Sequence, residues 1–348
     1  MKVGILNASS YAGLELARLL AGHPEFVLAA ATARSQAGQR LRDVFPSLAC
    51  TARPGIADLV LTPDIERQVD LIFSAMPHAA SAAALLPYIR DGIPVVDISG
   101  DFRLKNAAEY REFYGAEHPA PELLSAAVYG LTELHREELR NTKLVANPGC
   151  YPTGAILALA PALTAAVIEP DVIVDAKSGV SGSGRSLRLE SHFSEVNESV
   201  HAYRIGRHQH LPEMTQELAA VSRRAGGDGA VTLTFVPHLV PMTRGILTTC
   251  YARLRRDATP EGLGALYREF YGDSPFVQVA DDAPQTKATW GSNFCLVHPT
   301  VDRRSGRLVV VASLDNLVKG ASGQALQNAN LMVGLPEETG LQMTPLFP

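Results

Sequence analysis

The stretch KVGILNASSYAGLELARLLAG, residues 2–22, decides the fold of the first part of the chain. Residues 2–6 form a short apolar run typical of a buried strand, and residues 11–21 carry apolar side chains at helical spacing. A turn of small residues, GILNASSYAG at 4–13, overlaps and joins the two segments. A strand, a tight turn and a helix in this order begin a nucleotide-binding βαβ unit.

The same alternation continues through residue 149. Residues 26–31, 69–76 and 93–99 read as further strands, and residues 81–90 read as a helix. Strands that alternate with helices predict parallel βαβ units. We therefore expect an α/β fold in which residues 1–149 form a Rossmann-like, doubly wound parallel sheet domain.

Longer strand patterns follow Cys150, with helices segregated between them, which predicts an α+β catalytic and dimerisation domain over residues 150–315. The expected strands are 171–178, 229–240, 245–254 and 306–314, and the expected helices are 211–224 and 261–271. Helical spacing returns at 318–335. We expect residues 316–348 to carry this helix back to the first domain.

Net charge, apolar runs and cysteine spacing limit the partners and the cellular location that we expect. The 348 residues carry a net charge of −5, which disfavours nucleic acid and a membrane surface as partners. The longest apolar run, 155–168, is too short to span a bilayer, and the N-terminus lacks a signal-peptide pattern. The four cysteines form no C-x-x-C pair. Free thiols predict a reducing, cytoplasmic location.

The turn at residues 4–13 keeps half of a glycine series. Gly4 and Gly13 remain, whereas Asn7 and Ser10 occupy the other two positions. Asn tolerates positive φ, Ser10 could donate its hydroxyl to phosphate, and the helix N-terminus near Tyr11 favours an anion. The alternative is an ordinary Ser/Gly-rich turn of an α/β protein.

The end of the second strand bears on the choice of cofactor. An NAD site usually has Asp or Glu there, but LAAATARSQAG (28–38) carries Arg34 and Ser35 instead. A cation and a hydroxyl suit a 2′-phosphate, which favours NADP(H). The alternative is a solvated loop arginine.

A second glycine-rich stretch, GVSGSGRS at 179–186, comes close to the phosphate loop of nucleotide triphosphatases. Arg185 stands where that motif needs lysine, and the following residues have poor helical patterning. We therefore disfavour kinase or ATPase chemistry and expect a loop that crosses an active-site cleft.

The stretch NPGCYPTG, residues 147–154, places Cys150 where a buried helix is predicted to begin. The helix macrodipole favours an anion there, which predicts a lowered thiol pKa and a nucleophile. The remaining cysteines, Cys50, Cys250 and Cys295, read as small apolar residues.

Three histidines, His201, His208 and His210, cluster downstream. In an extended stretch His208 and His210 face the same side. A metal site is one reading of H-x-H, but no zinc-type spacing accompanies it, so we predict no metal. The other reading is one histidine as general acid/base and the other as a structural or substrate contact, with Glu213 orienting one of them.

A thiolate beside a nicotinamide predicts a specific chemistry. The sulfur attacks an activated acyl group, a thioester forms, and hydride reduction releases an aldehyde. The leaving phosphate needs an anion site. Arg103, in DISGDFRL (97–104), follows a predicted strand at its carboxyl end, where ligands of parallel sheets collect.

In these residues and along its whole length, the chain resembles the N-acetyl-γ-glutamyl-phosphate reductases, which are NADPH-dependent enzymes of arginine biosynthesis. LVANPGCYPTGAILALAP (144–161) is similar to the active-site signature of that family. Further blocks occur in the same order: VVDISGDFRL, AKSGVSGSGR, GRHQHLPEM, VPHLVPMTRGIL and DNLVKGASGQALQNANLM. The resemblance implies reduction of N-acetyl-γ-glutamyl phosphate, with homo-dimers or homo-tetramers and a small-molecule substrate and phosphate as partners.

The resemblance implies that Cys150 is the nucleophile and His210 the acid/base. Arg103, His208 and Arg244 are candidates for substrate binding. The expected NADP(H) contacts are Ser10, Tyr11, Ala12, Gly13, Arg34, Ser35, Gln36, Gly182 and Asn316.

The chain departs from the family at Asn7 and Ser10, where its members commonly have glycine, and we hypothesise a slightly displaced pyrophosphate. Three alternatives are a reductase acting on a carrier-linked aminoadipyl phosphate, an aspartate-semialdehyde dehydrogenase, and a catalytically idle nucleotide sensor. The Pro-Gly-Cys motif opposes the first, the GRHQHLPEM block opposes the second, and Cys150 with His210 opposes the third.

Overall fold

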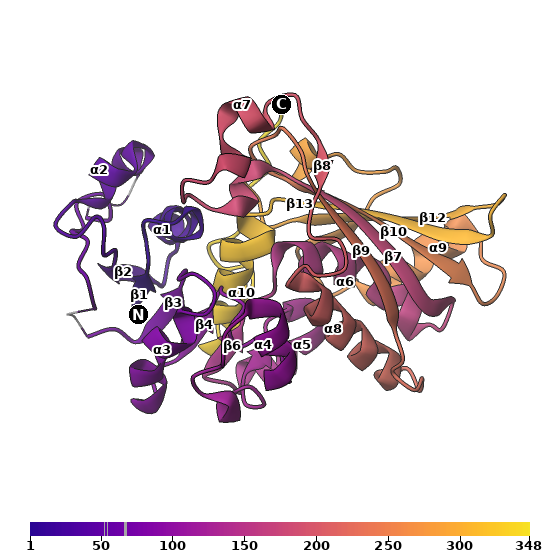
Figure 1. Ribbon diagram of the computed structural model, residues 1–348, viewed down its shortest axis with the longest axis horizontal. Helices are drawn as coiled ribbons and strands as arrows, with labels where there is room; N and C mark the ends of the chain where they lie inside the picture. Colours follow the sequence, from indigo (N-terminus) through magenta and orange to yellow (C-terminus); the bar gives the residue numbers. More distant parts are fainter. Residues whose placement is uncertain (52, 54, 66–67) are drawn as a thin grey trace. The chain divides into compact units, whose positions relative to one another are not determined.

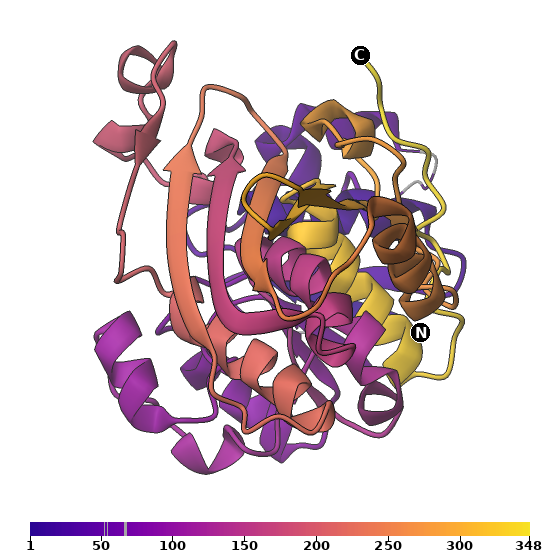
Figure 2. The same ribbon diagram turned by 90° about the vertical axis from the view of Figure 1, so that its right-hand side faces the viewer.

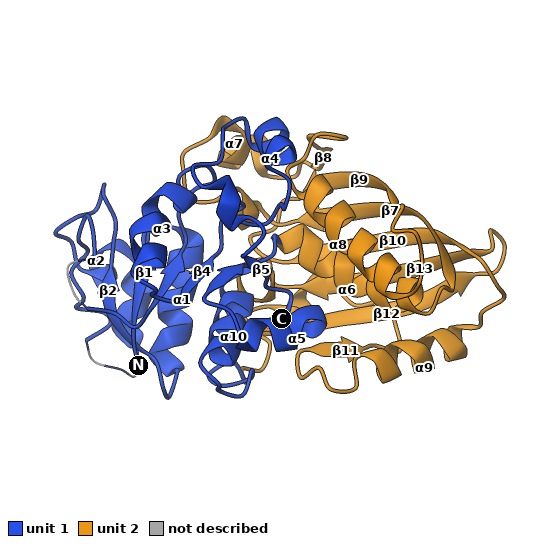
Figure 3. Cartoon of the chain, turned by 90° about the horizontal axis from the view of Figure 1, so that it is seen from below, with its two compact units in different colours: residues 1–149, 321–342 blue, residues 150–320, 343–348 orange. Residues whose placement is uncertain are grey.

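The computed structural model describes residues 1–51, 53, 55–65 and 68–348. It divides the chain into two compact units (Figure 3). Unit 1 comprises Met1–Gly149 and Ala321–Gln342, and unit 2 comprises Cys150–Gly320 and Met343–Pro348.

Unit 1 is built on a six-stranded sheet in the order β2-β1-β3-β4-β6-β5, and every pairing in it is parallel. Its strands are β1 (Lys2–Leu6), β2 (Val27–Ala31), β3 (Leu71–Ser74), β4 (Val95–Asp97), β5 (Val128–Tyr129) and β6 (Leu144–Ala146). The central strands are fully buried because both faces of the sheet are covered, which explains their uniformly apolar sequences. The predicted doubly wound parallel sheet is therefore confirmed.

The helices of unit 1 include the two predicted at 11–21 and 81–90 and a shorter one inside the predicted range 318–335. They are α1 (Tyr11–Gly22), α2 (Leu41–Val44), α3 (Ser81–Arg90), α4 (Ala107–Tyr114), α5 (Thr132–Arg140) and α10 (Gly323–Met332). Helix α10 is buried almost throughout, and several of its amide side chains are hydrogen-bonded inside unit 1, whereas the Gln324 side-chain oxygen has no partner among the described residues. Asn328 donates to the Gly130 carbonyl (2.7 Å) and accepts from the Thr132 hydroxyl (2.7 Å).

Unit 2 contains a mixed seven-stranded sheet in the order β11-β12-β13-β10-β7-β9-β8, whose long strands run side by side in Figure 2. The strands are β7 (Ile168–Ser178), β8 (His201–Ala202), β9 (Thr232–Leu239), β10 (Ile246–Leu254), β11 (Val277–Val279), β12 (Cys295–Asp302) and β13 (Arg307–Leu314). Helices α6 (Cys150–Thr164), α8 (His210–Arg224) and α9 (Pro260–Phe270) accompany it, and α7 (Phe193–Val196) is a single turn. The predicted α+β domain is confirmed.

One face of this sheet packs on helix α6, and the alternation along β7 shows it. Val172, Val174 and Ala176 are completely buried, whereas Ile173 between them is 40% exposed. Helices α6 and α8 lie side by side on the buried face (Figure 1). The other face stays open in the single chain.

The predicted C-terminal segment 316–348 is too long. Residues 321–342 belong to unit 1, but 316–320 and 343–348 belong to unit 2. Gly320 packs so closely that an added Cβ would lie 2.9 Å from the Cβ of Cys150, and the Leu346 amide donates to the Trp290 carbonyl (2.8 Å). These contacts hold both ends of the segment in unit 2.

Candidate active site

The turn between β1 and α1 forms an anion cradle. Asn7 adopts φ 60°, the left-handed conformation that glycine takes in many relatives of this fold. Its side-chain amide donates to the Ala75 carbonyl at the end of β3 (2.9 Å). Asparagine therefore accepts the strained conformation and also ties two neighbouring strand ends together.

Ser10 is the N-cap of α1. Its hydroxyl accepts from the Gly13 amide (3.0 Å) and donates to the Asn7 carbonyl (3.0 Å). The single proton of this hydroxyl is used within the turn here, so its donation to a phosphate stays a prediction that requires the bond to Asn7 to open. Tyr11 and Ala12 begin the helix, and within the described residues no acceptor faces their amides. These two N–H groups are thus available to an external anion.

Gly13 lets α1 begin against the turn. A Cβ there would lie 2.6 Å from the Asn7 carbonyl oxygen and 2.6 Å from the Ala8 Cα, distances that no side chain tolerates. The backbone must therefore approach itself at this position, which is the reason that a nucleotide turn needs glycine.

The residues after β2 lie beside this turn, because β2 pairs with β1. Arg34 and Ser35 are exposed, and Ser35 donates its hydroxyl to the Gln36 side-chain oxygen (2.8 Å). Within the described residues, Arg34 makes no ion pair. A guanidinium that is not neutralised by the chain suits an external phosphate.

Beyond β4, the chain holds two buried carboxylates that the sequence reading missed. Asp97 accepts from the hydroxyls of Ser81 (2.6 Å) and Ser99 (2.7 Å), and burial, followed by the charge of Asp101, raises the pKa of Asp97 to about 6. Asp101 accepts from the Ala82 amide at the start of α3 (2.9 Å). The alternation of Asp and Ser in DISGD (97–101) is the sequence feature that could have indicated these buried carboxylates.

Arg103 lies in the loop after the carboxyl end of β4, as predicted. It is 3% exposed, and its guanidinium donates to the carbonyls of Asn147 (2.8 Å) and Ile98 (2.7 Å). These bonds join the loops that follow β4 and β6. Arg103 therefore stabilises unit 1 through these bonds, and its contact with a substrate phosphate stays a prediction.

In unit 2, Cys150 is the first residue of α6 and is half-buried. The next residue, Tyr151, donates its hydroxyl to the His238 carbonyl (3.0 Å) and accepts from Tyr203 (3.3 Å). Burial, followed by electrostatic interactions that include the Cys150 thiol, raises the pKa of Tyr203 to about 12 and that of Tyr151 further. Both phenols therefore stay protonated beside the sulfur at neutral pH.

The histidine stretch is not extended as predicted. Gln209 has helical φ and ψ, and His210 begins α8. The two rings nevertheless lie together, with centroids 4.8 Å apart, and His210 lies 5.9 Å from the Tyr151 ring. His208 Nδ1 accepts from the His210 amide (3.1 Å), so His208 caps this helix start. Glu213, in the same turn of α8, is fully buried.

The glycine-rich loop 179–184 is held by the segment before β10. Amides at 179–181 donate to the carbonyls of Gly245, Met242 and Thr243 at 2.8–3.1 Å. Asn316 bridges both segments, since it donates to Ser181 (2.9 Å) and accepts from the Gly245 amide (2.8 Å). Gly182 is exposed in a 3₁₀ turn, and no α-helix follows directly as a phosphate loop requires.

Arg244 comes from the same segment. Its side chain is 26% exposed and pairs with the buried Asp315 (3.2 Å). The Trp290 indole donates to the Arg244 carbonyl (3.0 Å), which accounts for a tryptophan whose role the sequence did not reveal. The cation is therefore fixed in place while part of it still faces solvent.

Two further findings concern the described residues. No cluster of three His, Cys, Asp or Glu side chains among them is placed to hold a metal ion. No helix in this part of the chain is both long and apolar enough to cross a bilayer.

The two parts of the chain match the two domain models of the semialdehyde dehydrogenase family. The NAD binding domain of that family matches residues 2–142, and its dimerisation domain matches residues 150–316. Among solved structures, aspartate semialdehyde dehydrogenase II of Vibrio cholerae has a TM-score of 0.71 at 17% identity, covering 96% of this chain and 98% of that one. Aspartate semialdehyde dehydrogenase with NADP from Candida albicans gives a TM-score of 0.68 at 17% identity, covering 95% and 98%.

Curated relatives are much more similar in sequence. N-acetyl-gamma-glutamyl-phosphate reductase of Dehalococcoides mccartyi is 50% identical over 347 residues, covering 100% of this chain and 99% of that protein. The reductase of Pelotomaculum thermopropionicum is 48% identical over 351 residues, covering 100% and 99%. The chain belongs to the N-acetyl-gamma-glutamyl-phosphate reductase family.

Proposed function

We propose that this protein reduces N-acetyl-γ-glutamyl phosphate to N-acetylglutamate 5-semialdehyde and phosphate, with NADPH as the reductant. The observation that carries the proposal is Cys150 at the first residue of α6, half-buried beside two protonated tyrosines. A helix N-terminus stabilises a thiolate, and a thiolate is the nucleophile that acyl transfer requires. The names of the 46–50% identical relatives support the same substrate.

The cysteine acts first in the proposed mechanism. Its sulfur attacks the acyl carbon, the bond from that carbon to the phosphate oxygen breaks, and phosphate leaves with the electron pair. NADPH, when bound, supplies the hydride that reduces the resulting thioester. Collapse of the thiohemiacetal breaks the carbon–sulfur bond, so the aldehyde leaves and the thiolate returns.

His210 is the proposed acid/base. It is 7% exposed, lies against Tyr151, and begins α8 with its backbone amide held by His208. We propose that it holds the proton that the thiohemiacetal oxygen gains and loses. His208 then acts as a positioning residue rather than as a substrate ligand.

The residues of unit 1 fit a dinucleotide. The amides of Tyr11 and Ala12 would hold the pyrophosphate at the α1 N-terminus, where Gly13 provides the close approach. Arg34 would pair with the 2′-phosphate, with Ser35 and Gln36 beside it, which favours NADPH over NADH. In unit 2, Arg244 is a candidate for a substrate anion, while Gly182 and Asn316 shape the loop 179–184.

We also propose that the protein forms a homodimer through the open face of the unit 2 sheet. Ile173, Tyr251 and Val309 stand opposite one another on three adjacent strands, forming an apolar row on that face. Such a row is expected to be covered by a partner, and a two-fold copy supplies the same row. Light scattering measures the mass in solution, which distinguishes this dimer from a tetramer of two such dimers. None of the four cysteines forms a disulfide, which suits a reducing cytoplasm.

The test is phosphate-dependent NADP reduction with N-acetylglutamate semialdehyde, comparing the wild type with Cys150→Ser. We expect a loss of roughly 10³-fold or more in the serine variant, because a hydroxyl is a far weaker nucleophile than a thiolate. NADPH titration should give the same affinity for both proteins. An inactive wild type contradicts the proposed reaction, and an active serine variant contradicts the mechanism.

A further inference from the structure

A cavity of about 350 Å³ lies in unit 2 where helices α6 and α8 end. Its floor is apolar, formed by Leu163, Ala166, Ile168 and Pro170. Its rim contains charged and polar groups from three other segments: Ser222 of α8, the turn 225–228 that follows, and Arg255 after β10. None of these residues takes part in the proposed reaction.

The cavity lies at the far ends of the helices that carry the candidate catalytic residues. Cys150 and His210 are the first residues of α6 and α8, and the Tyr151 and His210 rings are neighbours. Leu163 and Ser222, in the last turns of the same helices, line the cavity together. The two helices therefore run in the same direction, and their 15 residues span about 22 Å.

The carboxyl end of α8 gives one side of the cavity a negative character. Helix α8 ends in a glycine turn in which Gly227 donates to the Ser222 carbonyl (2.9 Å). Asp228 follows at once, and among the described residues one of its oxygens accepts a hydrogen bond, from the Ala230 amide (2.9 Å). A helix C-terminus next to a carboxylate favours a bound ammonium group. Arg256 donates to the Ala165 carbonyl (3.1 Å), so the corresponding end of α6 is already compensated.

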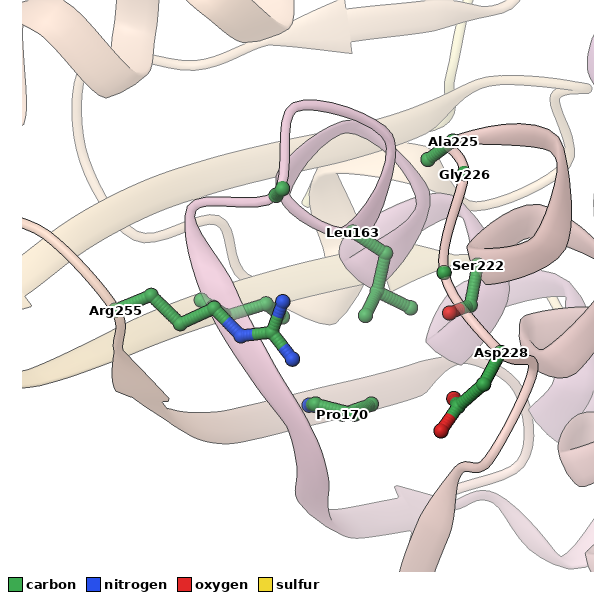
Figure 4. Close-up of a pocket in the computed structure, with 10 residues that line it drawn as sticks. Leu163, Pro170, Ser222, Ala225, Gly226, Asp228 and Arg255 are labelled. Carbon is green, nitrogen blue, oxygen red and sulfur yellow. The ribbon is translucent and has the colours of Figure 1, made fainter.

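Arg255 supplies the opposite charge. Figure 4 shows its guanidinium and the Asp228 carboxylate on opposite sides of Pro170, both directed into the cavity. They form no ion pair with each other, and among the described residues Arg255 makes no side-chain hydrogen bond. The Ser222 hydroxyl also points inward, from a residue that is 9% exposed. Both Arg255 and Asp228 are exposed residues, and their opposite charges lie on either side of the apolar floor.

The backbone is strained where the chain leaves α6 and lines the cavity. Ala166 has φ 50°, a conformation that normally selects glycine after a helix. Its amide donates to the Leu163 carbonyl (3.0 Å), closing the helix end. Keeping a methyl group there costs roughly 1 kcal/mol relative to glycine, and the methyl group contributes to the apolar floor.

We propose that this cavity binds a free α-amino acid with a branched apolar side chain, at a site separate from the candidate active site. The ligand carboxylate pairs with Arg255, its ammonium group faces Asp228 and the α8 C-terminus, and its side chain lies on Leu163, Ile168 and Pro170. A zwitterion is the ligand class that matches two opposite charges kept apart over apolar surface. The site would sense an amino acid at the far ends of the two catalytic helices.

The test is calorimetric titration of the full chain with L-leucine, alongside 4-methylpentanoate and 3-methylbutylamine. Each of the last two probes keeps the side chain and only one charge. We expect L-leucine to bind at least tenfold more tightly than either, since each charged contact is worth about one order of magnitude. Equal binding of the three probes, or no leucine binding at about 10 mM, would overturn the proposal.

Variants locate the site independently of activity. Arg255→Gln and Asp228→Asn should each weaken leucine binding about tenfold, whereas Arg253→Gln, an exposed arginine on β10, should leave it unchanged. Unchanged melting temperatures without ligand establish that the variants fold. Binding must also survive alkylation of Cys150. Loss on alkylation, or equal affinity in all variants, would place leucine elsewhere and contradict the assignment, whatever the outcome for the proposed reductase reaction.

Discussion

Helix α1 follows strand β1 through residues 7–10, and helix α6 follows strand β6 through residues 147–149. In the first turn Ser10 caps the helix, and the amides of Tyr11 and Ala12 are left for a charge that comes from outside the chain. In the second, the helix begins with Cys150, so its N-terminus acts on a side chain of the protein itself. The same backbone feature thus serves either a ligand or a nucleophile, depending on the first residues of the helix.

The two turns also differ in how they tolerate substitution. At the α1 turn a glycine position holds Asn7, because asparagine adopts positive φ and gains a bond to Ala75. At the α6 turn the crowded position is Gly320, remote in sequence, which faces the Cβ of Cys150. The backbone approaches closely in both turns, but only in the α1 turn does another side chain, that of Asn7, take a glycine position.

The largest effect is expected for Gly320→Ala. The new Cβ would lie 2.9 Å from the Cys150 Cβ and 3.3 Å from the Asp315 carbonyl oxygen, so the sulfur must move. A displacement of about 1 Å costs roughly 100-fold in kcat, while NADPH affinity should stay unchanged. Steady-state kinetics and NADPH titration separate the two effects. Gly22→Ala, which meets nothing within 4 Å, is the matched control; an effect of similar size there would contradict the steric explanation.

Gly13→Ala should change the α1 turn, and it should weaken NADPH binding rather than lower kcat. Its Cβ would clash with the backbone of residues 7 and 8 at 2.6 Å, so the cradle for the pyrophosphate must open. Overpacking of about 1–3 kcal/mol predicts a rise of roughly 10-fold to 100-fold in the Kd for NADPH. Fluorescence titration measures it. Unchanged cofactor affinity would remove the anion role from the α1 turn.

Arg34→Gln tests whether the protein prefers NADPH to NADH because of this arginine. One charge-assisted contact to a 2′-phosphate predicts a loss of about tenfold in kcat/KM with NADPH and no change with NADH. Arg90→Gln, an exposed arginine at the end of α3, controls for net charge. Equal losses with both cofactors would show that Arg34 supports the fold rather than reading the phosphate.

The smallest effect is expected for Asp97→Asn in unit 1. Burial raises the pKa of Asp97 from 3.8 to about 6, so the folded state binds a proton more tightly than the unfolded chain. Its contribution to stability is therefore present below about pH 4 and is lost as the pH rises through about 6. Calorimetric melting from pH 4 to 7 should show a decline in the wild type that Asp97→Asn flattens. A decline of equal slope in both proteins would exclude Asp97 as its source.

Much of the fold could be predicted because apolar periodicity reflects burial. Residues 2–6 and 81–90 match β1 and α3 at both ends, since each is bounded by turn residues. Strand β12 was missed because His298 and Pro299 interrupt its pattern, although β13 pairs along its whole length. Strand pairing, rather than local propensity, decides such a segment.

The site was less predictable than the fold for a physical reason. Cys150 and Gly13 act through local backbone geometry, which their neighbours in the sequence reveal. Arg103 follows β4 as the sequence indicates, but its bonds to the Ile98 and Asn147 carbonyls could not be predicted, because only folding brings those carbonyls together. His208 likewise caps α8, which an extended reading of H-x-H could not anticipate.

The central claim is that the sulfur at the start of α6 takes the acyl group from phosphate. The most direct measurement mixes the full-length protein with N-acetyl-γ-glutamyl phosphate in the absence of NADPH and analyses the acid-quenched chain by peptide mass spectrometry. We predict one N-acetylglutamyl group, attached to Cys150, that disappears when NADPH is added before the quench. An unmodified Cys150 in a protein that turns over the same substrate would contradict the account.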